Sequence, residues 1–130
     1  MEEIKIAEFK DLKVGKYVLI DGEPCRVLST THSKPGKHGG AKVRVDAIGL
    51  FDDQKRVIIG PVNQKIEVPV VNKKTAQVLV AIKDKAQLMD MQSYETFELQ
   101  IPDELKDKLS EGISVMYLEY GSKRRILQLA

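Results

Sequence analysis

Apolar and polar side chains alternate with a period of two in many short segments of this 130-residue chain. Such alternation is typical of β-strands that bury one face. It is clearest in "AKVRVDAI" (41–48), and the Asp21–Gly22 pair of "DGEP" is typical of a hairpin turn. The predicted strands are 17–20, 25–31, 41–48, 57–59, 66–71, 76–82, 86–91, 94–99, 113–119 and 125–129. The pattern therefore predicts an all-β protein.

One segment in the second half, "IPDELKDKLSEG", departs from the β pattern. Pro102 and Asp103 are typical of a helix start, Leu105 and Leu109 are four residues apart, and Gly112 is typical of a helix end. The segment lies between the third and fourth predicted strands of this half. Five strands interrupted there by one short helix are typical of an OB-type barrel.

A polar break near the middle of the chain predicts a domain boundary. In "VPVVNKK" (68–74) a proline weakens the strand and three polar residues follow. We therefore expect two small domains, residues 1–69 and 70–130. Lys and Arg outnumber Asp and Glu by twelve to ten in the first, and the counts are nine and nine in the second. The excess positive charge lies in the first domain.

Several classes of protein do not fit this sequence. Cys25 is the only cysteine, which excludes a scaffold held by intramolecular disulfides and fits a reducing cytoplasm. We expect Cys25 to be a small buried side chain. The first residues mix acids and bases, unlike a secretory signal. The longest apolar runs are far shorter than the roughly 20 residues that span a bilayer. We expect a cytoplasmic protein without a membrane partner.

The stretch "SKPGKHGGAK" (33–42) carries three lysines, one histidine, three glycines and one proline, but no acidic residue. Gly36 and Lys37 match the end of a phosphate-binding P-loop. The match fails elsewhere, because Thr31 stands in place of the first glycine and His38 in place of the hydroxyl that binds magnesium. Nucleotide hydrolysis is therefore disfavoured.

Three other interpretations of this stretch remain. A metal site is weakly supported, because Cys25, His32 and His38 lack the spacing of paired ligands. A Schiff base on Lys37 would need a pocket that lowers the pKa of the amine. The plainest interpretation is a solvated turn whose lysines maintain solubility. From the residue pattern alone, the solvated turn is favoured.

The order of residues in this stretch resembles the modification loop of the translation initiation factor 5A family, whose bacterial counterpart is elongation factor P. Lys37 falls on the lysine that carries hypusine or deoxyhypusine in that family. Pro35 and Gly40 stand where eukaryotic members usually carry Thr and His, and together with the short ends of the chain they indicate an archaeal member. The matching residues are Ser33, Lys34, Gly36, Lys37, His38, Gly39, Ala41 and Lys42.

The resemblance implies a fold and a function. An SH3-like domain (1–69) would carry the loop, and an OB domain (70–130) would follow. The protein would be a monomer that binds ribosomal RNA and peptidyl-tRNA on the ribosome and promotes peptide-bond formation, notably at proline-rich stretches. It would not be an enzyme and would need no cofactor, because deoxyhypusine synthase, a separate enzyme, modifies Lys37 from spermidine.

A second basic group, Lys123, Arg124 and Arg125, lies near the last predicted turn. It could add an RNA contact, or it could be an ordinary solvated hairpin.

Two alternatives for the whole protein also stay open. One is a general RNA-binding protein of SH3 and OB type that acts without modification, and the other is an enzyme that uses Lys37 in Schiff-base chemistry.

Overall fold

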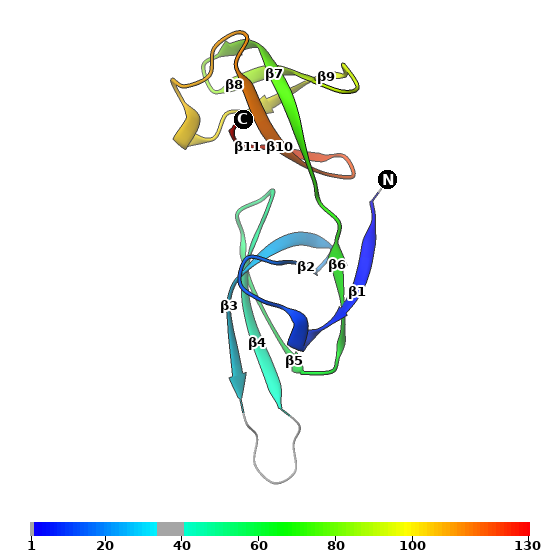
Figure 1. Cartoon of the computed structure of the whole chain (residues 1–130). Helices are drawn as coiled ribbons and strands as arrows, with labels where there is room; N and C mark the ends of the chain where they lie inside the picture. Colours follow the sequence, from blue (N-terminus) through cyan, green and yellow to red (C-terminus); the bar gives the residue numbers. More distant parts are fainter. Residues whose placement is uncertain (1, 34–40) are drawn as a thin grey trace. The chain divides into compact units, whose positions relative to one another are not determined.

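A computed structural model describes residues 2–33 and 41–130 of the chain. It divides into two compact units, Met1–Val70 and Val71–Ala130, each with its own hydrophobic core. Both units consist almost entirely of antiparallel strands (Figure 1). No helix in the described part of the chain is long and apolar enough to cross a membrane.

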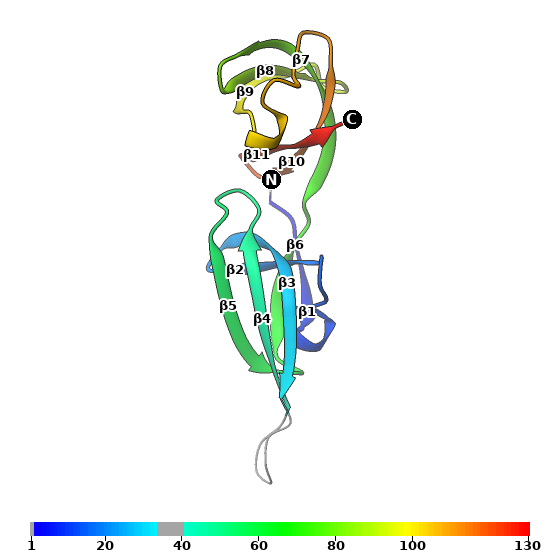
Figure 2. The same ribbon diagram turned by 90° about the vertical axis from the view of Figure 1, so that its left-hand side faces the viewer.

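The first unit contains a four-stranded sheet and a two-stranded ribbon. The sheet has the order β2-β3-β4-β5, so each strand pairs with its neighbours in the sequence. The strands β3, β4 and β5 lie side by side in Figure 2. In the ribbon β1 pairs with β6, and β6 also lies against β2. The elements are β1 (Ile4–Glu8), a 3-10 helix η1 (Phe9–Asp11), β2 (Tyr17–Ile20), β3 (Glu23–Ser33), β4 (Lys42–Gly49), β5 (Lys55–Pro61) and β6 (Lys65–Pro69).

The alternation in the sequence determines which side chains of the first sheet face its core. In β4, Val43 and Val45 are fully buried, whereas Lys42 and Arg44 point outward and are exposed. The predicted turn between β2 and β3 is present at Asp21 and Gly22, whose φ angles of 52° and 79° are both left-handed. A two-residue hairpin of type I′ requires positive φ at both positions, which explains the Asp-Gly pair.

The second unit is a single curled sheet of five strands in the order β11-β10-β7-β8-β9. Its outer strands β9 and β11 approach each other, so the sheet closes toward a barrel. Register shifts in the β7–β8 and β10–β11 pairings mark bulges, which increase strand bending and twist. The elements are β7 (Asn72–Ile82), β8 (Lys85–Asp90), β9 (Thr96–Gln100), a 3-10 helix η2 (Asp103–Leu105), β10 (Ser114–Tyr120) and β11 (Lys123–Leu129).

The short helix of the second unit begins where the sequence predicts but ends earlier. It is one 3-10 turn at Asp103–Leu105, and the chain does not continue helically toward Gly112. Asp107 adopts a left-handed φ of 70°, which interrupts any helix at that point. Leu105 is nevertheless buried in the core, so the apolar position was correctly identified.

The observed architecture confirms the predicted fold class. It is all-β, with an SH3-like curled sheet followed by an OB-type sheet of five strands and one short helix. Two elements of the first unit were not predicted, the strand β1 and the 3-10 turn η1. β1 exists because Ile4 to Glu8 pair with residues about sixty positions later, a relationship that local pattern does not reveal.

Candidate functional site

The β3–β4 hairpin connects directly to the stretch that the sequence singled out. The antiparallel ladder runs from Cys25 opposite Gly49 to Ser33 opposite Lys42. Of the predicted loop, the structure places Ser33, Ala41 and Lys42. The other predicted residues, Lys34, Pro35, Gly36, Lys37, His38, Gly39 and Gly40, lie outside the described residues.

Backbone pairing fixes both ends of this connection. Ser33 is paired with Lys42, and its hydroxyl lies 3.5 Å from the Lys42 carbonyl oxygen. The Ala41 carbonyl accepts a hydrogen bond from the Val62 amide at 3.1 Å, which ties this end to the turn after β5. Opposite the exposed end of β3, the buried Val43 anchors β4 in the core. The loop sequence therefore begins and ends on strands of fixed register.

Cross-strand rows on the outer face of the sheet continue from these ends. The register places Thr31 opposite Arg44 and Arg44 opposite Ile59. In the next row Asp46 accepts hydrogen bonds from Arg44 at 3.3 Å and from the Ser29 hydroxyl at 3.1 Å. Cations and hydroxyls thus lie beside the loop ends, and the acid among them is already paired. Sequence reasoning did not single out this face, although the alternation in 41–48 contains it.

Cys25 is a packing residue, as the sequence predicts. Its side chain is fully buried in the core of the first unit. Burial raises the pKa of the thiol, and the nearby Arg56 guanidinium, 3.9 Å from Sγ, offsets this only in part. Because the thiolate is the reactive form, Cys25 is not suited to nucleophilic chemistry.

The second predicted contact group, Lys123, Arg124 and Arg125, lies at the start of β11. Arg124 donates from Nε to Glu119 at 2.8 Å and from Nη2 to Glu95 at 2.7 Å. Its guanidinium also lies 4.3 Å from the centroid of the Phe97 ring. Arg124 therefore braces β9, β10 and β11 within the second unit, and its charge is balanced there. An RNA contact by the three residues remains a prediction.

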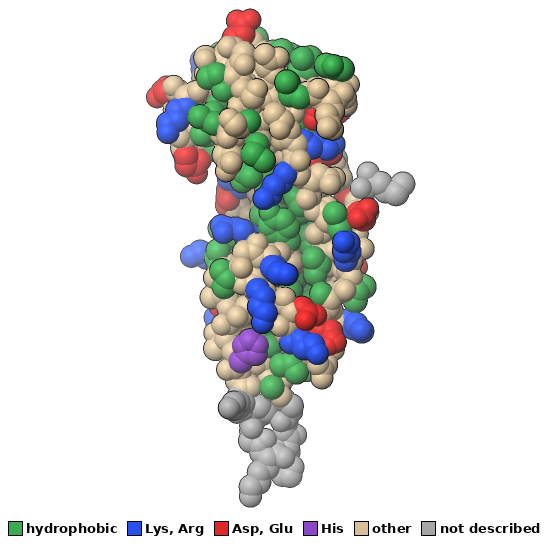
Figure 3. All heavy atoms as spheres, viewed as in Figure 1, with side chains coloured by type: hydrophobic (Ala, Val, Ile, Leu, Met, Phe, Trp, Pro, Cys, Tyr) green, Lys and Arg blue, Asp and Glu red, His purple; other side chains and the backbone are tan. Residues whose placement is uncertain are grey.

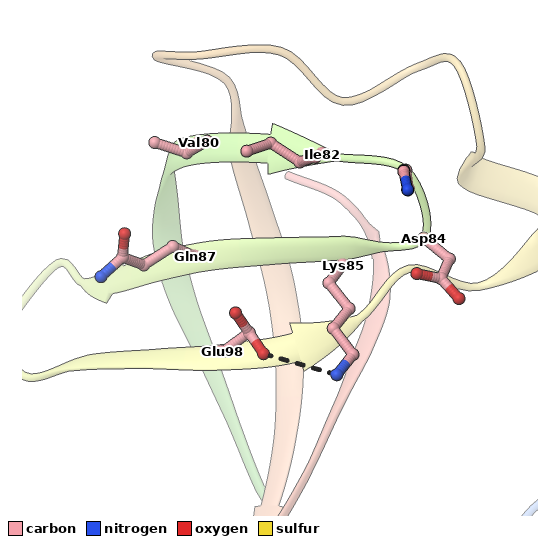
Figure 4. Close-up of a pocket in the computed structure, with 7 residues that line it drawn as sticks. Val80, Ile82, Asp84, Lys85, Gln87 and Glu98 are labelled. Carbon is pink, nitrogen blue, oxygen red and sulfur yellow. Dashed lines mark ion pairs between the residues drawn. The ribbon is translucent and has the colours of Figure 1, made fainter.

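The second unit also has an open groove of about 330 Å³ on the outer face of β7, β8 and β9. Val80 and Ile82 line one side, and the Lys85–Glu98 ion pair, with 3.7 Å between nitrogen and oxygen, lies on the other (Figure 4). Neither this groove nor any other described part of the chain gathers three or more His, Cys, Asp or Glu side chains suited to a metal ion.

Charge of both signs is spread over the surface. On the face seen in Figure 3, Lys and Arg side chains are interspersed with Asp and Glu. This distribution agrees with the formal net charge of only +2. Polyanion binding would therefore depend on local groups such as Lys42 and Arg44 beside the loop ends, since the net charge is small.

Comparisons with known proteins agree with this architecture. A family model described as "Translation initiation factor 5A-like, N-terminal" matches residues 5–63. The chain is 55% identical to "Translation initiation factor 5A" of Archaeoglobus fulgidus, over 95% of this chain and 96% of that protein. It is 49% identical to the protein of the same name from Methanothermobacter thermautotrophicus, over 95% of each. The solved structure "Eukaryotic translation initiation factor 5A from Methanococcus jannaschii" shares 42% identity and a TM-score of 0.89, covering 98% of this chain and 95% of that one.

Proposed function

The chain belongs to the translation initiation factor 5A family, and we propose that it promotes peptide-bond formation on the ribosome through a hypusine or deoxyhypusine on Lys37. It would bind beside the peptidyl-tRNA and act notably at proline-rich stretches. The observation that carries the proposal is the position of "SKPGKHGGAK" between β3 and β4 in a chain so similar to archaeal members over nearly its whole length.

The hairpin suits a residue that must be presented at a distance from its domain. The fixed pairing of Ser33 with Lys42 provides a firm base, and Gly36, Gly39 and Gly40 allow backbone conformations that side chains would strain. A modifying enzyme needs such access to add the aminobutyl group of spermidine to the lysine. We assign this step to deoxyhypusine synthase, so that the chain needs no cofactor of its own.

On the ribosome the extended amine of Lys37 would reach toward the acceptor end of the peptidyl-tRNA. No bond to the factor forms or breaks, so the factor is not an enzyme. The gain in rate comes from holding the substrate in a reactive geometry, which can contribute several kcal/mol when the substrate is otherwise mobile. The factor would act in the cytoplasm as a monomer.

The outer face beside the loop ends supports contact with RNA. Lys42 is exposed, and Arg44 and the Thr31 hydroxyl lie in the adjacent row. Cations and hydroxyls of this kind contact phosphates of ribosomal RNA and tRNA without reading their sequence. Asp46 would repel phosphates less than a free carboxylate, because Arg44 and Ser29 already bind it.

Mass spectrometry of the protein purified from its own organism tests the proposal. We expect a 4-aminobutyl-type addition, with or without a hydroxyl group, on Lys37 and on no other lysine. Peptides that contain Lys42 serve as the internal control. An unmodified Lys37 in actively translating cells would contradict the proposal.

The OB-type unit favours one alternative, a general RNA-binding protein that acts without modification. Recombinant unmodified protein and native protein would then bind ribosomes and stimulate translation equally. A clear advantage of the native protein in stimulating translation would exclude this alternative.

A further inference from the structure

The turn between β8 and β9 presents an aromatic side chain to solvent. Tyr94 is 70% exposed, whereas the other aromatic side chains of the described chain are buried or half-buried. An exposed tyrosine combines a large flat face with a polar tip, and both suit a binding surface better than an ordinary turn.

The backbone at Tyr94 is unfavourable for a tyrosine. Its φ angle is 62°, in the left-handed region that glycine or asparagine adopts more readily. Glycine or asparagine would adopt this backbone conformation at a lower energetic cost than tyrosine does. Residues in such conformations occur disproportionately at ligand-binding and catalytic sites, where the surrounding structure holds them.

The surrounding structure fixes this turn through Asp90. Asp90 is only 4% exposed, and its Oδ1 accepts hydrogen bonds from the amides of Gln92 and Ser93, both at 2.8 Å. Its Oδ2 accepts a hydrogen bond from the buried Tyr117 hydroxyl at 2.5 Å. The Tyr94 amide donates to the Asp90 carbonyl at 3.0 Å. The core of the second unit thus holds the turn that presents the ring.

A second set of contacts fixes the residue after Tyr94. The Glu95 amide donates to the Ser93 hydroxyl at 3.3 Å, and the Glu95 carbonyl accepts from the Asp90 amide at 2.9 Å. The Glu95 carboxylate binds Arg124 at 2.7 Å. The negative charge next to the exposed ring is therefore balanced by a cation, which reduces the repulsion of an anionic ligand.

The same turn also borders a hollow with basic residues. Asp90, Met91 and Gln92 line a hollow of about 320 Å³ together with Lys73, Lys74 and Thr75 at the start of β7. Lys74 is already paired with Glu119 at 2.7 Å. The Met91 amide donates to the Thr75 carbonyl at 3.0 Å, which joins the turn to β7. Lys73 is exposed there. One end of the unit therefore offers an aromatic face, a methionine and a cation on connected backbone segments.

We propose that Tyr94 is an RNA-contact residue, on which an unpaired nucleobase stacks while Lys73 contacts the sugar-phosphate backbone. Stacking on aromatic rings beside cations is how proteins bind single-stranded RNA without sequence preference. A protein partner would instead require a contiguous apolar area. The ring lies among polar neighbours, Gln92, Ser93 and Glu95, so an isolated flat face fits a base better.

The test uses the full-length unmodified chain, because this site does not depend on Lys37. Binding of a fluorescent single-stranded RNA of about ten nucleotides is measured at low salt. We expect Tyr94→Asn to weaken binding at least about fivefold, whereas Tyr94→Phe keeps the ring and the affinity. The thermal midpoint of Tyr94→Asn should equal or exceed that of the parent, because asparagine accepts a left-handed φ. Ile82→Asn is a matched control at an exposed position of the same unit and should bind like the parent.

Lys73→Gln provides a second measurement. It should weaken binding and reduce the slope of log affinity against log salt by about one, as expected when one phosphate contact is lost. Equal RNA affinity of the parent and Tyr94→Asn would overturn the proposal and leave a protein partner as the explanation of the exposed ring. That result would leave the proposed role of Lys37 untouched.

Discussion

The hydroxyl of Tyr117 donates a hydrogen bond of 2.5 Å to the carboxylate of Asp90, joining β10 to β8 inside the second unit. Both side chains are nearly completely buried, with exposures of 1% and 4%. Burial, followed by the contact with Asp90, raises the pKa of Tyr117 far above its usual range. The hydroxyl therefore stays protonated at neutral pH and can donate this hydrogen bond.

Replacing Tyr117 with phenylalanine should destabilise the protein by about 1–3 kcal/mol, because a buried carboxylate loses a hydrogen bond. The ring and its packing against Phe97, with 5.0 Å between centroids, are retained. Denaturant unfolding measures the change. Tyr94→Phe removes a hydroxyl from an exposed ring and should change stability by no more than about 0.5 kcal/mol. Equal stability of the two variants would show that the Tyr117 hydrogen bond contributes little.

Stability should fall in acid through the protonation of Asp90. Burial alone would raise the pKa of this carboxyl, but hydrogen bonds from Tyr117, Ser93 and Gln92 lower it from 3.8 to about 2. Because the pKa is lower in the folded chain, the stabilisation is complete above about pH 4 and disappears as the pH falls toward 2. Its full size is roughly 2 kcal/mol. The measurement is denaturant unfolding at a series of pH values.

The variant Asp90→Asn isolates this contribution. It should be less stable than the parent at neutral pH, and the difference should shrink between about pH 4 and pH 2. The pKa of Asp52 is also lowered to about 2, mainly by its hydrogen bond with Arg56. Asp52 is present in both proteins, so its contribution to the pH dependence cancels in the comparison. A difference that stays constant with pH would show that the charge of Asp90 is unimportant.

The sequence predicted the strands well wherever one face alone is buried. Alternation identified β4 and the Asp-Gly pair identified the β2–β3 turn, because both features depend on neighbouring residues. β1 was not predicted although Ile4, Lys5 and Ile6 alternate, because this short strand depends on pairing with β6 about sixty residues later. The length of the helix predicted between Pro102 and Gly112 was overestimated. The helix signals at Pro102 and Asp103 do not reveal the left-handed backbone at Asp107.

The candidate site was predictable to a different degree. Residue order alone pointed to Lys37, since a specific loop sequence is recognisable without coordinates. The ion pairs of Arg124 with Glu119 and Glu95 could not be foreseen, because they join β11 to β10 and to the turn between β8 and β9, segments that are apart in the sequence. Tyr94 was also missed, because the local sequence predicts neither its exposure nor its left-handed backbone conformation.

We predict that residues 1–70 and 71–130 fold when expressed separately. The first unit has a core around Phe9, Val18 and Val45, and the second has one around Leu88 and Tyr117. Each fragment should melt cooperatively and give dispersed NMR spectra. Unfolded fragments from both halves would show that the units depend on each other.

Lys37→Arg separates the charge of this lysine from its modification. The substitution keeps a positive charge in the connection between β3 and β4 and changes no position of the strands that the sequence predicts. Stability should therefore change by no more than about 0.5 kcal/mol. Arginine cannot accept the aminobutyl group, and its branched guanidinium does not replace an extended amine. The variant should bind ribosomes weakly through the remaining basic side chains.

Reconstituted translation of a proline-rich template, with modified parent and variant at equal concentrations, measures the consequence. We expect the parent to accelerate peptide-bond formation and Lys37→Arg to give the rate seen without factor. Lys42→Arg is the matched control, since it changes a lysine at the end of the same loop and leaves Lys37 available for modification. Equal rates for the parent and Lys37→Arg would mean that the loop acts only as a positive patch. The unmodified RNA-binding alternative would then be preferred, because a positive patch needs charge alone, whereas positioning of the substrate needs the added length of the modified side chain.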